Sequence, residues 1–249
     1  MSDIGETVEE TSEKTSENIN ESGGNTGKDK GKRKKHEIDM VNGPILKKML
    51  VFALPLMLSS IMQMLFNATD IVILGQFVGD HSLAAVGSTS SLINLLTNLF
   101  IGLSVGANVL VGRYFGGRKM QQLNEAIHTA VTISFASGLM LAVIGFIAAE
   151  PILRLMQTPD NLVGLAALYM RVLFLGMPSM MLYNFGSAIL RAKGDTKRPL
   201  FFLLAAGVTN VVLDLVFVIA FNMSVAGVAT ATAIAQTLSA ALVIRCLLR

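Results

Sequence analysis

A carboxylate inside an otherwise apolar run marks the place where this chain could do chemistry. Asp214 is the only charged residue between Pro199 and Phe221, and Asn210 precedes it by four positions. At that spacing the two polar side chains share one face of a helix. A carboxylate in such surroundings is costly to bury unless it has partners, so we expect other segments to bring polar groups to it.

Two other apolar runs carry polar residues at a matching depth. Asp70 and Asp214 each lie about seven positions before the end of their runs, and Thr232 lies about seven positions after the start of the last run. With a rise of 1.5 Å per residue, each of these three residues lies about 10 Å from that end of its helix. Gln63, Asn67 and Asp70 also recur at helical spacing, which predicts one polar face.

These residue types point to a site for a proton or a small cation. Two carboxylates that face each other repel, so the pair readily takes up a positive charge. Carboxylate, amide and hydroxyl oxygens are also the ligands that a hard cation prefers. We therefore predict that Asp70, Asn210, Asp214 and Thr232 bind H⁺ or Na⁺. The alternative is that each Asp only caps or pairs with a helix end near the membrane surface.

The composition indicates a membrane protein. Hydrophobic residues make up 52% of the 249 residues, and the mean hydropathy is +0.59. Residues 1–40 hold ten of the 17 acidic side chains, so the rest of the chain has too few charges to cover a soluble domain. The single Cys excludes an internal disulfide and a multi-cysteine metal site. The expected class is an all-α, polytopic membrane protein.

Six apolar runs predict six membrane-spanning helices. Their expected bounds are Leu46–Gln76, Leu83–Tyr114, Leu123–Ala148, Leu162–Ala192, Thr196–Phe221 and Val225–Leu248. Pro55 and Pro178 should kink the first and fourth of these helices. The loops after the second and fourth helices are basic, as is the tail, whereas the loops after the first and fifth lack Lys and Arg. This asymmetry predicts a multi-pass protein of the plasma (inner) membrane with both termini in the cytoplasm.

The segment before the first helix has a different character. Residues 1–41 are predicted to form a disordered cytoplasmic tail, because they contain few large apolar residues to bury. Residues 28–35 form a basic cluster. That cluster either acts as a solvated spacer that sets the topology or lies on anionic membrane lipid.

The second predicted helix is unusually polar. Asn94 and Asn98 lie in a run of Ser, Thr and Asn side chains that either lines an aqueous cavity or forms hydrogen bonds between helices. Together with Asn67 they are the predicted substrate-cavity residues. Gly102-x-x-x-Gly106 follows in the same helix and is typical of close helix packing.

Four stretches carry a resemblance to a known family. They are Thr69-Asp70-Ile71-Val72-Ile73-Leu74-Gly75, Gly112-Arg113-Tyr114-Phe115-Gly116-Gly117, Leu190-Arg191-Ala192-Lys193-Gly194-Asp195-Thr196-Lys197-Arg198-Pro199, and Asn210-x-x-x-Asp214 followed by Gly227-Val228-Ala229-Thr230-Ala231-Thr232. In this order and spacing, residues 42–249 resemble the N-terminal lobe of the multidrug and toxic compound extrusion (MATE) transporters of the MOP superfamily.

The resemblance implies secondary antiport of small organic, often cationic, drugs against H⁺ or Na⁺. It implies a transporter rather than an enzyme, with no catalytic residues, no cofactor beyond the coupling ion and no nucleic-acid partner. Carried over residue by residue, the family's N-lobe cation site falls on Asp70, Asn210, Asp214 and Thr232, with Gln63 and Asn184 as further candidates. Na⁺ is a possible ligand of the first four.

The chain departs from the family in length. Family members have twelve helices in two lobes, and this chain reaches Arg249 after six. We expect a truncated product that lacks the second lobe, with a homodimer of six-helix chains as the alternative. Two other functions stay open: a flippase of lipid-linked precursors from the same superfamily, and a membrane fragment that transports nothing.

Overall fold

The computed structural model describes residues 45–248, which form seven α-helices and one short π-helix. In chain order these are α2 (Ile45–Phe77), α3 (Asp80–Gly116), α4 (Met120–Leu155), α5 (Asp160–Leu175), α6 (Met177–Ala192), α7 (Lys197–Leu215), the π-helix η1 (Val216–Ala220) and α8 (Val225–Leu247). The predicted tail, with its basic cluster, lies outside the described residues. The predicted all-α membrane fold is confirmed.

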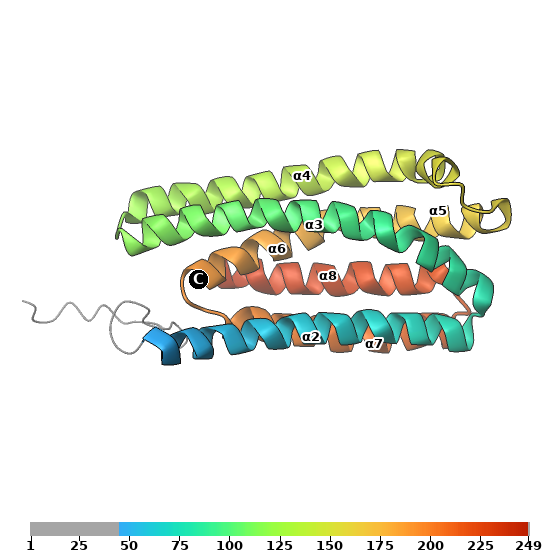
Figure 1. Ribbon diagram of the computed structural model, residues 1–249, viewed down its shortest axis with the longest axis horizontal. Coiled ribbons are helices and arrows are strands. Elements are labelled where there is room, and N and C mark those ends of the chain that lie inside the picture. Colours follow the sequence, from blue (N-terminus) through green and yellow to red (C-terminus); the bar gives the residue numbers. More distant parts are fainter. Residues whose placement is uncertain (1–44, 249) are drawn as a thin grey trace, which may run out of the picture. The chain divides into compact units, whose positions relative to one another are not determined.

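By length and composition, these helices make up to six membrane spans. Five spans, with α7 and η1 together as one, are long and apolar enough to cross alone, and α5 with α6 makes a sixth, bent span. Figure 1 shows the start of α2 and the end of α8 at the same end of the bundle, as an even number of crossings requires. The predicted number of six spans agrees with this count when the bent pair of α5 and α6 is taken as one span.

The bent span is broken beside Pro178. α5 and α6 meet at Gly176 with a bend of 48°, and Pro178 occupies the first turn of α6. A proline ring clashes with the carbonyl four residues earlier and has no N–H to donate, so a helix tends to break just before it. Gly176 also lies against Ala233 of α8, where a Cβ would come within 3.1 Å of the Ala233 Cβ. The predicted kink at Pro178 is confirmed. By contrast, α2 continues through Pro55 without interruption.

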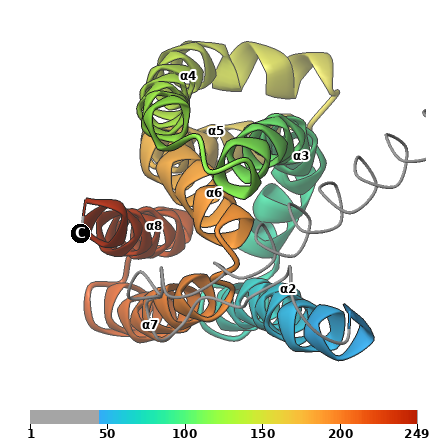
Figure 2. The same ribbon diagram turned by 90° about the vertical axis from the view of Figure 1, so that its left-hand side faces the viewer.

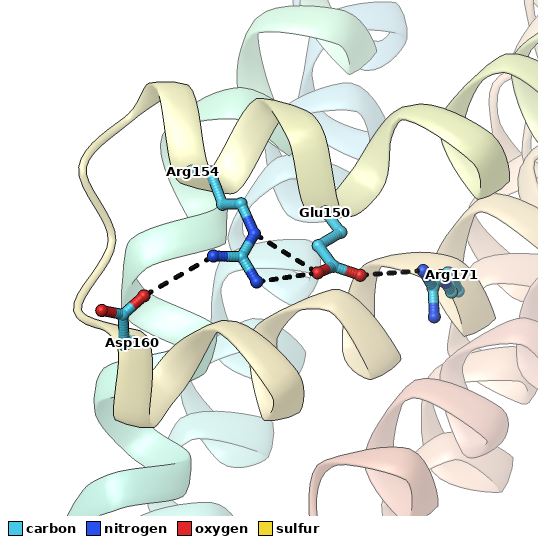
Figure 3. Close-up of polar contacts among 4 residues, drawn as sticks. All are labelled: Glu150, Arg154, Asp160 and Arg171. Atoms are coloured by element: carbon cyan, nitrogen blue, oxygen red, sulfur yellow. Dashed lines mark hydrogen bonds and ion pairs between the residues drawn. The ribbon is translucent and has the colours of Figure 1, made fainter.

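The predicted end of the third helix is wrong. We expected a loop after Ala148, but α4 continues through Pro151 to Leu155. Ion pairs stabilise the extra turns and join them to α5 (Figure 3). Arg154 lies 3.0 Å from Glu150 on the same helix and 3.6 Å from Asp160, while Arg171 of α5 lies 3.5 Å from Glu150. The charged residues after Ala148 were expected to lie in a loop. They instead form ion pairs between α4 and α5.

The packing centre of the bundle is α6. It contacts α3, α4 and α8, and the end-on view of Figure 2 shows it in the interior. α2 lies at the edge, and its principal neighbour is α7. α7 in turn packs along α8. This order places α2, α7 and α8, the three helices with the predicted cation-site residues, next to one another.

The outer faces of α2 and α3 are apolar and open. In the most apolar stretch of α2 only 6% of the residues are buried, against 12% for α3, so these two helices pack least within the chain. A Cβ on Gly102 or Gly106 would meet nothing within 4 Å. The predicted Gly-x-x-x-Gly packing is therefore wrong within the described residues. Such a surface suits lipid or a further membrane-embedded partner, where exposed apolar side chains carry no penalty.

Candidate cation site

α7 carries the buried part of the site. Leu203, Gly207, Asn210 and Asp214 lie on its buried face, at intervals of three and four residues. Asp214 is 0% exposed and Asn210 is 5% exposed. Neighbouring helices therefore enclose both polar groups, as an intramembrane functional residue requires.

α2 brings the second carboxyl to α7. Phe66, Asp70 and Ile73 follow one another at helical spacing along its inward side, and Ile73 is buried in an apolar cluster with Val218 and Val228. Asp70 itself is half-buried. It therefore lies at the border between the packed stripe of α2 and the exposed side of the helix.

The four predicted residues meet in one place. The carboxyl groups of Asp70 and Asp214 lie close enough to interact with each other, and Asp70 also lies near the Thr232 hydroxyl. The amide Nδ2 of Asn210 donates to Thr232 Oγ1 at 3.4 Å. Thr232 Oγ1 lies 2.9 Å from the backbone carbonyl of Val228, to which it donates. Three helices thus supply carboxyl, amide and hydroxyl groups to a single cluster.

The carboxyl pair of Asp70 and Asp214 is short of hydrogen-bond donors in the described part of the chain. Both side-chain oxygens of Asp214 and Oδ1 of Asp70 are buried without a hydrogen-bond donor among the described residues. Two carboxylates are both acceptors, so they can approach closely only with a proton or a cation between them. The described part of the chain has no group of three or more His, Cys, Asp or Glu side chains that could hold a metal ion. The carboxyl, amide and hydroxyl groups of the cluster are of the kind that a hard cation prefers.

A match to a known protein family shows to which family the chain belongs. The family model MatE matches residues 55–216, which span the first five membrane crossings and end two residues after Asp214. The chain belongs to the MatE family.

Similar proteins share this assignment. The probable multidrug resistance protein YoeA of Bacillus subtilis (strain 168) is 35% identical over 207 residues, covering 82% of this chain and 44% of that protein. A crystal structure of MATE in the straight conformation matches with a TM-score of 0.79 at 26% identity, over 86% of this chain and 48% of the other. The bent conformation matches with a TM-score of 0.74 at 27% identity, over 81% and 45% of the two chains. The chain thus spans about half the length of these MatE relatives.

Other predicted residues stay apart from the carboxyl pair in this MatE chain. Gln63, Asn67, Asn94 and Asn98 are exposed, and Asn184 is half-buried on α6 without a side-chain hydrogen bond in the described part of the chain. Gln63 and Asn67 share one face of the continuous helix α2 with Asp70, as predicted, but both are more exposed than Asp70. They lie toward the exposed side of α2, because its packed stripe runs through Phe66.

Sequence reasoning missed two features of the candidate site. Tyr169 of α5 is close enough to Asp70 and Asp214 for their charges to act on its phenol group. It lies nine residues after the start of α5, so the depth argument could have found it had it been applied to the fourth span. The π-helix η1 begins two residues after Asp214. π-Helical turns are frequent at functional sites, but nothing in the composition of that apolar run predicts one.

Proposed function

We propose that this chain is one lobe of a secondary antiporter that exports small organic, often cationic, compounds in exchange for H⁺ or Na⁺. The observation that carries the proposal is the Asp70–Asp214 pair, in which both oxygens of Asp214 and Oδ1 of Asp70 are buried without a donor among the described residues. The name of its relative YoeA, a probable multidrug resistance protein, supports the same substrate class. Asp70 and Asp214 would bind the coupling ion, and Asn210 and Thr232 would supply neutral polar groups.

Coupling would act through the position of α2. Uptake of H⁺ or Na⁺ removes the repulsion between the two carboxylates, which favours close contact of α2 with α7. Loss of the ion restores the repulsion and favours separation. Because α2 packs chiefly on α7 and contains Pro55, we propose that uptake of the ion lets α2 bend near Pro55. Binding of the ion also changes the charge of the lobe interior and hence the affinity of the lobe for a cationic substrate.

A second six-helix lobe, or a second copy of this chain, would complete the transporter. The open apolar faces of α2 and α3 would then contact it or lipid, and Asn67, Asn94 and Asn98 would face the substrate cavity between the lobes. Plasma-membrane location with both termini in the cytoplasm belongs to the same proposal, since it follows from the distribution of basic loops.

Reconstitution of the purified chain into phosphatidylcholine/phosphatidylglycerol vesicles tests the proposal. We expect a fluorescent organic cation to move against either an imposed proton gradient or an imposed Na⁺ gradient, and comparison of the two gradients identifies the coupling ion. Empty vesicles and vesicles with the Asp214→Asn variant are the controls. Absence of gradient-driven movement and of substrate counter-flow would identify the chain as a fragment that transports nothing by itself.

A further inference from the structure

α2 and α7 meet through an aromatic ring that lies on a glycine. A Cβ built on Gly207 of α7 would fall among the ring atoms of Phe66 of α2, closer than real contacts allow. Gly207 is buried and Phe66 is half-buried. Any side chain larger than hydrogen at position 207 must therefore displace the ring or separate the two helices.

This contact has a fixed register with the cation site. Phe66 precedes Asp70 by one helical turn on the same side of α2, while Gly207 precedes Asn210 by one turn and Asp214 by two turns on the buried face of α7. α7 is the principal neighbour of α2. Because an α-helix is stiff over two turns, the separation of the helices at Phe66 determines their separation at Asp70.

We propose that Phe66 and Gly207 form a positioning contact that sets the distance between α2 and α7 at which the carboxyls of Asp70 and Asp214 meet. The inference rests on the proposed function, since it takes this pair to be the coupling-ion site. Neither Phe66 nor Gly207 touches the ion. Glycine is required at 207 because only a bare backbone admits the ring, and an aromatic residue at 66 fills the space that the glycine leaves.

Infrared spectroscopy of the purified chain in lipid vesicles tests the contact directly. Spectra are recorded in sodium-free buffer across a range of pH, and the carboxyl bands of the site are those that disappear in Asp70→Asn and Asp214→Asn. We expect wild type to show the band of a hydrogen-bonded carboxyl pair. In Gly207→Ala we expect bands of separate carboxyls instead, and ion uptake reduced about tenfold or more, since shifts of about 1 Å degrade preorganised sites.

A second substitution separates displacement of α2 from misfolding. In Phe66→Leu/Gly207→Ala the smaller Leu side chain leaves room for the new methyl group, so the paired band and ion uptake should recover toward wild type. The double-mutant cycle should therefore show strong coupling between the two positions. If Gly207→Ala instead misfolds the chain, the further change Phe66→Leu should restore neither the paired band nor ion uptake.

Two other glycines provide matched controls. Gly164→Ala adds a methyl group where nothing lies within 4 Å and should leave the spectrum unchanged. Gly145→Ala adds one against the Phe174 ring, between α4 and α5. It should lower thermal stability and keep the paired band. If Gly145→Ala separates the band as much as Gly207→Ala does, the effect is general core damage and the proposal is overturned.

The remaining outcomes distinguish this contact from the site that it serves. A paired band in wild type that Gly207→Ala leaves unchanged overturns the positioning contact alone. A double variant that behaves like Gly207→Ala also overturns it. A wild-type spectrum without a band that depends on Asp70 and Asp214 overturns the proposed site together with the contact.

Discussion

Replacing Asp214 by Asn should reduce gradient-driven transport by this chain at least about tenfold, which corresponds to ~1.4 kcal/mol of lost coupling. Asn keeps the shape of the side chain but does not accept a proton or neutralise a cation. Asp214 is 0% exposed and faces Asp70, so its replacement by Asn leaves only one carboxyl of the pair. The measurement is substrate movement into reconstituted vesicles under a proton or Na⁺ gradient.

Matched acid-to-amide substitutions define the specificity of that effect. Asp70→Asn should reduce transport to a similar degree, because it removes the other half of the pair. Asp80→Asn, on the exposed first turn of α3, should leave transport within about twofold of wild type. Normal transport by Asp214→Asn, or equal losses for all three variants, would show that the pair is not the coupling site.

Replacing Leu153 by Ala should lower the free energy of unfolding by about 2–4 kcal/mol. Leu153 is 0% exposed and belongs to the apolar cluster that joins α4 to α5 and α6, with Met170 and Phe174. The substitution leaves a cavity that the surrounding helices cannot fill, so the loss includes packing as well as transfer of the side chain. Thermal unfolding of the purified chain in mild detergent measures the change.

The same helix offers the control for that prediction. Leu155, two positions further along α4, is 83% exposed. Leu155→Ala should change the free energy of unfolding by less than about 0.5 kcal/mol. Equal effects of the two substitutions would mean that the end of α4 does not pack as described, which would place in doubt its contact with α5.

Much of the fold follows from the apolar pattern of the sequence. A span needs about 20 apolar residues, and six such runs separated by short loops leave little choice of architecture. The meeting of Asp70, Asn210, Asp214 and Thr232 also follows from the sequence, because helix rise converts position into depth and helical period gives the shared face. These arguments need only the regular geometry of single helices.

The features that could not be predicted depend on how helices pack. The sequence predicts a loop at Glu150 and Arg154, because the order of residues does not reveal their ion pairs with each other and with α5. Likewise, the contact of Phe66 with Gly207 joins two positions 141 residues apart, and nothing local to either indicates it. The exposure of Gln63 and Asn67 has the same origin, since it depends on which side of α2 meets α7.

The count of ions bound per chain is the most direct test of the central claim, that Asp70 and Asp214 together hold a single coupling ion. The purified chain in detergent is titrated with radioactive Na⁺ and, separately, with acid in a pH-stat to count protons taken up. We predict that wild type binds a single Na⁺ or gains a single proton that both Asp70→Asn and Asp214→Asn fail to bind. Wild type and both variants binding the same number of ions would contradict the account.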